Sequence, residues 1–178
     1  MKIDQGTIRV FTYKEGMLAR LAHDLRLTLS KFEIEIDGKN ISATFWPESF
    51  SVDGTIVDEQ VRSDKLKKKD CTEILENMHT QVLHSDGFPT ACLHGQISQK
   101  GNDRAVVEGT LELVGQKRLV EIQVRRDMGR IKGSVELVPS RWGIKPFSAL
   151  LGAIRVQDRV LICFDLLEPV GLIPSNKH

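Results

Sequence analysis

A histidine followed by an acidic residue, His23-Asp24, comes closest in this chain to acid–base chemistry. A carboxylate beside an imidazole can fix the tautomer of the ring and prepare it to accept a proton. Neighbouring residues on a strand point to opposite faces, however, which favours a structural role for this pair. A serine nucleophile lacks its usual context, because no G-x-S-x-G occurs and Ser148 stands in Pro-Phe-Ser-Ala. The sequence therefore predicts no catalytic residue and no enzymatic activity.

The chain has five histidines, at positions 23, 79, 84, 94 and 178. None of them pair at H-x-H, H-x-x-x-H or H-E-x-x-H spacing, the patterns that place two imidazoles on one regular face. The sequence also lacks a Walker loop and a G-x-G-x-x-G run, so a nucleotide cofactor has no phosphate-binding loop. We expect neither a metal site nor a cofactor.

The three cysteines, Cys71, Cys92 and Cys163, are odd in number and form no C-x-x-C pair. We expect free, buried thiols in a reducing compartment. The first six residues lack the apolar core and cleavage site of a signal peptide, so the sequence as written predicts a cytoplasmic protein. No apolar stretch approaches the ~20 residues of a membrane-spanning helix, and no integral membrane segment is expected.

The charge balance is close to neutral, with 25 basic and 24 acidic side chains. A net charge of +1 provides no general attraction for nucleic acid, which we therefore exclude as a partner. One local basic run, Lys65 with Lys67-Lys68-Lys69, precedes a predicted helix. Lysines there oppose the helix dipole, which favours a solvated loop; contact with an anionic membrane surface is the alternative.

Alternation of apolar and polar residues marks three successive runs in the second half of the chain, over 107–115, 120–124 and 131–137. A two-residue period is that of a strand with one buried and one solvated face. Three such strands in a row predict an antiparallel meander. A meander long enough to curl encloses an apolar interior, which is either a filled core or a pocket for an apolar ligand.

The same pattern predicts strands over 7–13, 25–36, 41–45, 90–99, 105–114, 119–126, 130–138 and 154–167. In the second of these the apolar positions change from odd to even numbers, so we expect a β-bulge or sharp bend at Ser30-Lys31. The segment 17–23 is consistent with a short helix or an irregular strand entry. A clear helix is predicted over 70–83, because Cys71, Ile74, Leu75, Met78 and Val82 recur at helical spacing. Asp70 and Glu73 suggest a capping box at its start.

About eight strands and one inserted helix fit a single domain over residues 1–178. The predicted fold is mainly β, an eight-stranded antiparallel barrel with the helix and some short helical turns. Closure would remove exposed edges, and eight strands enclose just enough room for side chains or one slender ligand.

Three segments carry a resemblance to a known family. Residues 109–120 follow the pattern G-x-L-x-L-x-G-x-x-R-x-V, residues 142–152 read WGIKPFSALLG before a strand around Val156 to Val160, and His23-Asp24-Leu25 lies in an N-terminal strand region. Together they resemble the YceI-like family of lipocalin-like lipid-binding proteins. The resemblance implies a lipocalin-like barrel with a helix beside or across one end and a long cavity for an isoprenoid or fatty-acyl chain. Many members of that family are exported to the periplasm.

Ten residues are predicted to bind such a ligand. Eight of them occupy the apolar phase of their strands and should face inward: Leu111, Leu113, Ile122, Val124, Val135, Leu137, Ile162 and Phe164. Phe147 and Leu150 belong to the connection 142–152, which is too long for a simple hairpin turn and so should cover an open end of the barrel. A Pro near the start of 146–152 and a Gly at its end suggest a short helical turn. Both a core plug and a movable lid are consistent with this segment.

The leading hypothesis is a non-enzymatic protein whose barrel sequesters one long apolar molecule or lipid. The alternative is a structural or interaction domain with a barrel filled by side chains and no ligand. A cavity lined by glycine and small apolar residues would favour the first. The sequence is also compatible with a homodimer.

Overall fold

The computed structural model describes residues 1–15, 24–149 and 154–169. In these ranges the strands are β1 (Lys2–Ile3), β2 (Gly6–Glu15), β3 (Leu25–Leu29), β4 (Phe32–Asp37), β5 (Asn40–Phe45), β6 (Phe50–Val57), β7 (Gln60–Arg62), β8 (Ala91–Gln99), β9 (Arg104–Leu113), β10 (Gln116–Asp127), β11 (Arg130–Leu137), β12 (Ser148–Ala149) and β13 (Ile154–Leu167). The helix α1 (Lys68–Asn77) continues into a π-helical turn, η3 (Met78–Val82), and short 3-10 turns lie at η1 (Pro47–Ser49), η2 (Ser63–Lys65) and η4 (Pro139–Trp142). The prediction of a mainly β fold with one helix is confirmed.

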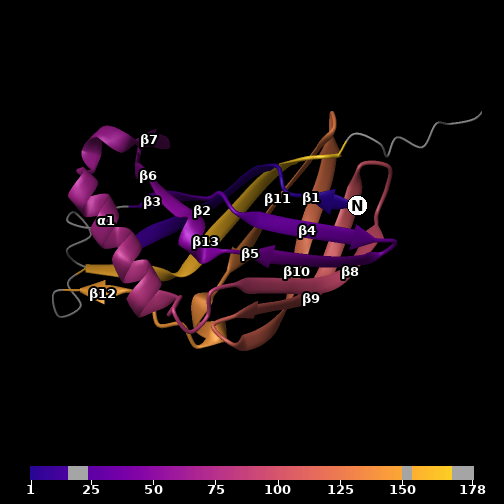
Figure 1. The fold of residues 1–178 in the computed structure, drawn as a ribbon. Coiled ribbons are helices and arrows are strands. Elements are labelled where there is room, and N and C mark those ends of the chain that lie inside the picture. The colour runs from indigo at the N-terminus through magenta and orange to yellow at the C-terminus, as the bar shows by residue number, and fades with distance from the viewer. Residues whose placement is uncertain (16–23, 150–153, 170–178) are drawn as a thin grey trace, which may run out of the picture.

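The strands form one antiparallel sheet in the order β1-β4-β5-β8-β9-β10-β11-β13-β2-β3-β6-β7, with β12 paired to β13. Strands β8 to β11 follow one another as a meander, as predicted. Figure 1 shows the long strands crossing the molecule side by side, with α1 at the end opposite the tip of the β4–β5 hairpin.

The prediction of a closed barrel of eight strands is not confirmed. The described residues form thirteen strands, and their pairing order has two free ends, β1 and β7. The count differs because the predicted strand 25–36 is divided at Ser30-Lys31, a further strand, β6, follows Pro47–Ser49, and the short strands β1, β7 and β12 add to the eight. Two-residue strands such as β1 are too short for their alternation to be recognised in sequence.

The interruption at Ser30-Lys31 lies where the sequence predicts it. Strand β3 pairs with β2 and β6, whereas β4 pairs with β5 and β1. The Lys31 N–H donates to Ser49 Oγ at 2.9 Å, and the Trp46 N–H donates to the Lys31 carbonyl at 3.2 Å. Because β3 and β4 stand near opposite ends of the pairing order, their direct connection brings those ends together and curls the sheet.

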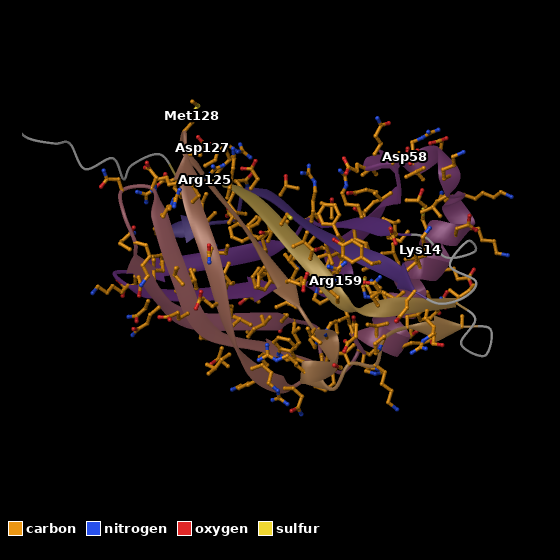
Figure 2. All side chains as sticks on the ribbon, turned by 180° about the vertical axis from the view of Figure 1, so that it is seen from behind. Lys14, Asp58, Arg125, Asp127, Met128 and Arg159 are labelled. Atoms are coloured by element: carbon orange, nitrogen blue, oxygen red, sulfur yellow. The ribbon has the colours of Figure 1, made fainter. Side chains whose placement is uncertain are left out.

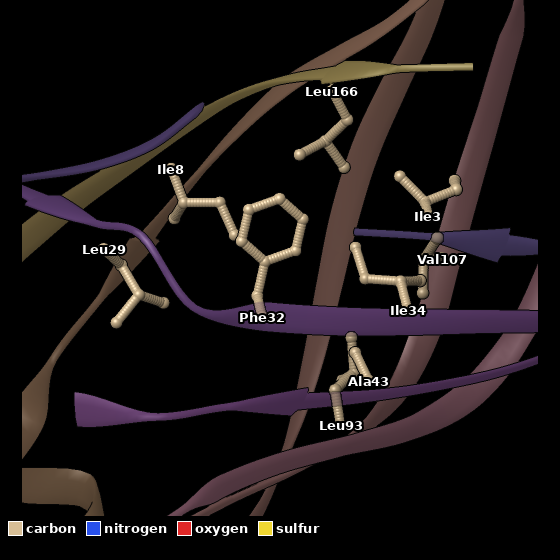
Figure 3. Close-up of a cluster of buried hydrophobic side chains, with 9 residues drawn as sticks. All are labelled: Ile3, Ile8, Leu29, Phe32, Ile34, Ala43, Leu93, Val107 and Leu166. Carbon is tan, nitrogen blue, oxygen red and sulfur yellow. The ribbon is translucent and has the colours of Figure 1, made fainter. Parts of the chain in front are cut away.

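A buried apolar cluster lies on the inner face of this curl. Figure 3 shows its members, which come from both ends of the sheet: Ile3, Ile8, Leu29, Phe32, Ile34, Ala43, Leu93, Val107 and Leu166. Leu29 and Phe32 belong to the same cluster although one has an odd and the other an even number. The bend between them therefore keeps one face of the chain turned inward through the change of phase.

The helix begins earlier than predicted. Asp70 accepts the Lys67 N–H at 2.8 Å, so Lys67 is the N-cap and Asp70 stands at the third helical position. The predicted capping box of Asp70 and Glu73 is wrong, because the structure forms it from Lys67 and Asp70. The sequence did not indicate this start, since lysine is an unusual N-cap residue.

The connection after β11 also differs from the prediction. Its helical turn is η4, before Gly143, whereas residues 144–147 have no regular structure and Ser148 pairs with Arg155 of β13. Trp142 is 1% exposed, and its Nε1–H donates to the Leu111 carbonyl at 2.9 Å. The backbone of η4 is thus fixed by a buried aromatic side chain.

Two glycines let β8 and β9 approach closely. Gly95 and Gly109 are directly paired, and a Cβ on Gly109 would lie 2.5 Å from the His94 carbonyl oxygen and 2.9 Å from the Gly95 Cα. Both atoms belong to backbone, which cannot yield without moving the strand. The close approach of β8 and β9 at this pair depends on the missing side chains.

We predict that Gly109→Ala lowers the free energy of unfolding by about 1–3 kcal/mol, the cost of overpacking. The control is Gly87→Ala, where the nearest atom to the new Cβ is the His84 carbonyl oxygen at 3.7 Å, and a change within about 0.5 kcal/mol is expected. Chemical denaturation of both variants provides the measurement. Equal stability of Gly109→Ala and the parent chain would contradict the close approach.

Candidate functional site

A cavity of about 380 Å³ lies inside the curl of the sheet. Its volume falls within the roughly 300–1,000 Å³ of small-molecule sites. Side chains from both ends of the sheet line it, including Ile8 of β2, Ile34 of β4 and Leu166 of β13. The cavity is therefore enclosed by the curled sheet as a whole and not by a single pair of strands.

Every second residue of a strand faces this cavity. On β9 the lining residues are Ala105, Val107, Leu111 and Leu113, with Arg104 at the start of the strand, and on β10 they are Val120, Ile122, Val124 and Arg126. The structure places all eight strand residues named from the sequence on the wall: Leu111, Leu113, Ile122, Val124, Val135, Leu137, Ile162 and Phe164. That they bind a ligand remains a prediction.

The two remaining predicted residues do not join them. Phe147 is half-buried and is not among the residues that line the cavity, and Leu150 lies outside the described residues. The connection instead contributes Pro139 and Ile144 to the wall, with Trp142 packed into the same cluster as Leu137 and Ile144.

The end of the helix provides wall residues that sequence reasoning did not assign to the site. Met78, Val82 and Leu83 line the cavity from η3 and the residue after it. The four-residue step from Met78 to Val82 marked an apolar helix face, but the sequence did not show that this face meets the sheet interior.

Inward positions in the middle of the wall carry little side chain. Gly95, Gly109 and Gly133 each fall between two lining residues two positions away, for example Val107 and Leu111 around Gly109. Strands therefore place these glycines in the inward phase. Ala43, Ala91 and Ala105 are lining residues as well. A Cβ added at Gly95 or Gly109 would meet the backbone of the neighbouring strand, and one at Gly133 would meet the Phe164 ring, so these glycines allow the wall to pack closely.

The ionisable groups of the described residues show little catalytic character. Asp24 Oδ1 accepts the Lys14 N–H at 2.7 Å, which gives this carboxylate a structural task, and His23 lies outside the described residues. Burial raises the pKa of the Cys163 thiol, against a smaller lowering effect of Arg9, so the thiolate nucleophile is disfavoured. All three cysteines are free thiols, half-buried rather than fully buried.

Metal-ligating side chains are scattered in the part of the chain that the structure describes, where no group of three or more could hold an ion. His79 Nδ1 lies 3.0 Å from Ser85 Oγ at the end of the helix and is thus engaged with a hydroxyl. No helix in the described ranges is long and apolar enough to cross a membrane.

Comparison with known proteins gives a clear result for the fold. No family model matches the chain, and no curated protein sequence matches it. BcnA of Burkholderia cenocepacia is similar in structure, with a TM-score of 0.62 at 14% identity over 92% of this chain and 96% of that one. A polyisoprenoid binding domain from Saccharophagus degradans, implicated in plant cell wall breakdown, has a TM-score of 0.62 at 12% identity over 94% and 98%.

The Campylobacter jejuni YceI protein is similar as well, with a TM-score of 0.51 at 10% identity over 80% of this chain and 84% of that one. The chain therefore has the fold of these proteins over most of its length. The resemblance to YceI-like proteins seen in the sequence is confirmed at the level of the fold.

We predict that Leu113→Asp destabilises the protein by at least about 3 kcal/mol, because an uncompensated charge would enter the apolar wall. The matched control is Leu119→Asp, since Leu119 is 75% exposed and the new carboxylate would stay in water. Thermal and chemical denaturation of the two variants are compared. A stable Leu113→Asp protein would show that this position does not face an apolar interior.

Proposed function

We propose that this protein binds one long apolar molecule, an isoprenoid or a fatty-acyl chain, inside the cavity and without catalysis. The observation that carries the proposal is the cavity itself, about 380 Å³ bounded almost entirely by apolar side chains. Such a space gains free energy by taking up hydrocarbon, at about 0.8 kcal/mol for each buried methylene.

The proposal includes a barrel in a looser sense than a closed sheet. If β3 with β4 and β5 with β6 are each taken as one interrupted strand, eight strands surround the interior, the others being β2, β8, β9, β10, β11 and β13. The chain connection at Ser30-Lys31 then takes the place of a closing ladder. An interior of this size suits one slender molecule.

The structural neighbours support the class of ligand. The Saccharophagus degradans protein is described as a polyisoprenoid binding domain, and this chain shares its fold. The volume of the cavity, about 380 Å³, supports a hollow interior over the alternative of a structural domain filled by side chains.

A binding role without chemistry agrees with the Asp24 carboxylate, which accepts a backbone hydrogen bond, and with the raised pKa of the Cys163 thiol. Ligand contact at the wall residues, a contribution of Phe147 and Leu150, a homodimer and a cytoplasmic location stay predictions.

We expect native mass spectrometry of the protein, purified without detergent, to show a bound lipid or loading by an added acyl or isoprenoid chain. Ile122→Trp should lower the affinity for that chain by about 10-fold or more, because overfilling the interior costs about 1–3 kcal/mol. The control is Gln123→Trp on the next position of the same strand, which faces solvent and should bind as the parent does.

Two results would contradict this proposal. An apo mass that resists loading by both chain types would favour the filled structural domain. Equal binding by the parent, Ile122→Trp and Gln123→Trp would mean that the ligand lies outside the cavity.

A further inference from the structure

Polar and charged residues gather at one end of the cavity, whose surface is otherwise almost entirely apolar. Its polar lining residues, apart from Thr12, are Gln99, Asn102, Asp103, Arg104 and Arg126, as far as the structure describes the wall. They belong to the β8–β9 hairpin and to the end of β10 beside it. There the backbone N–H of Arg126 donates to the backbone carbonyl of Asp103 at 2.8 Å. We call this group the hairpin end.

The other end of the cavity is apolar. Leu113, at the far end of β9 from Arg104, packs in one cluster with Val82, Leu83 and Ile144. The ten residues of β9, at about 3.3 Å each, separate the two ends by about 30 Å. The apolar cavity therefore has its charged lining residues at one end, and a ligand that matches this arrangement has one polar terminus.

Arg126 is directed toward the interior by the phase of its strand. It follows Val120, Ile122 and Val124 at two-residue steps, whereas Arg125 has the opposite phase. Figure 2 shows Arg125 and Asp127 near the tip of the β10–β11 hairpin, at the end of the molecule opposite Asp58 and Lys14. Arg126, between them in sequence, lies at that same end.

A second, more polar pocket adjoins the hairpin end. It is lined by Ile36, Gly38, Lys39, Ile97, Ser98, Gln99 and Arg126, four of which also line the apolar cavity. Lys39, Arg104 and Arg126 bring three positive charges to the two pockets, against Asp103 and the Glu168 that contacts Arg126. The balance at this end is positive.

The Arg126 guanidinium retains hydrogen-bonding capacity. Its Nη2 lies 3.0 Å from Glu168 Oε1, and the side chains of Arg126 and Glu168 are 48% and 13% exposed. Within the described residues Glu168 holds the guanidinium at Nη2, and a guanidinium has five N–H donors, more than this one carboxylate oxygen requires. A planar guanidinium matches a carboxylate or phosphate with two parallel hydrogen bonds.

We infer that the ligand carries an anionic head group, a carboxylate or a phosphate, which Arg126 binds at the hairpin end while the apolar tail extends toward η3. This inference rests on the proposed function. Lys39 adds a second positive charge beside the head group, and Asn102 and Gln99 offer further polar contacts.

The test compares matched acid and alcohol probes on the full chain. Palmitate is set against hexadecanol, and geranylgeranyl monophosphate against geranylgeraniol, with affinities from native mass spectrometry and isothermal titration. The parent should bind at least one acid about 10- to 100-fold more tightly than its alcohol, as expected for hydrogen bonds to a charged group. The preferred acid identifies the head group as carboxylate or phosphate.

Arg126→Gln should abolish this preference for the acid, because it should weaken the binding of the acid at least about 10-fold more than that of the matched alcohol. The control Arg125→Gln, on the neighbouring outward position, should keep the preference. If the alcohols bind but the parent shows no preference, or if Arg126→Gln retains it, the head-group inference fails and the proposed function stands. If neither acid nor alcohol binds the parent, both fail; the parent comparison decides this even where a variant does not fold.

The direction of the tail has an independent test. Trp46→Phe leaves Trp142, in the apolar cluster near Leu83, as the remaining tryptophan of the chain. Palmitate brominated at its terminal carbon should then quench the Trp142 fluorescence more strongly than palmitate brominated next to the carboxyl group. The reverse order would overturn the orientation.

Discussion

The curl of the sheet depends on a short interruption between two strands. Ser30 and Lys31 end β3 and allow β4 to begin with its apolar residues in the opposite numerical phase, yet on the same inner face. Strand β3 pairs toward β2 and β4 pairs toward β5, so one stretch of chain serves both ends of the sheet. Without the interruption, either Leu29 or Phe32 would turn to solvent, and the two ends would not share a core.

Because the interior contains a cavity, other parts of the protein must provide much of the packing that stabilises it. Well-packed cores owe much of their stability to close contact, which a cavity lacks. Here close packing is concentrated around the cavity, in the cluster that includes Ile3 and Phe32 and in the one that contains Trp142. Trp142 is almost fully buried and its indole N–H is satisfied by the Leu111 carbonyl. Within the described residues every buried side-chain nitrogen and oxygen has a hydrogen-bond partner. These contacts stabilise the sheet around the cavity.

Sequence patterns predicted those parts of the site whose side chains follow one strand period. Leu111 and Ile122 are examples, because alternation alone assigns them to the inner face. The position of η4 could not be predicted in this way, since it depends on where the Trp142 indole finds an acceptor on β9. The contribution of Met78 and Val82 depends on how the helix meets the sheet, a tertiary relation that helical spacing does not contain. The sequence predicted one strand over 25–36 where the structure has two. Alternation does not show that the chain changes its pairing partner at Ser30-Lys31, from β6 before the bend to β5 after it.

The apolar wall of the cavity orients a ligand mainly by excluding charged groups from most of its length. An ionised group placed beside Leu111 or Val135 would lose its hydration with no partner in return, at a cost far above that of a neutral polar group. At the hairpin end the same group keeps contact with water, because the Arg126 side chain is about half exposed. The Arg126–Glu168 pair adds direction there, since Glu168 restrains the guanidinium and leaves most of its donors free. The orientation of an amphipathic ligand would thus follow from the apolar wall, and the choice among polar head groups from the charges at its end.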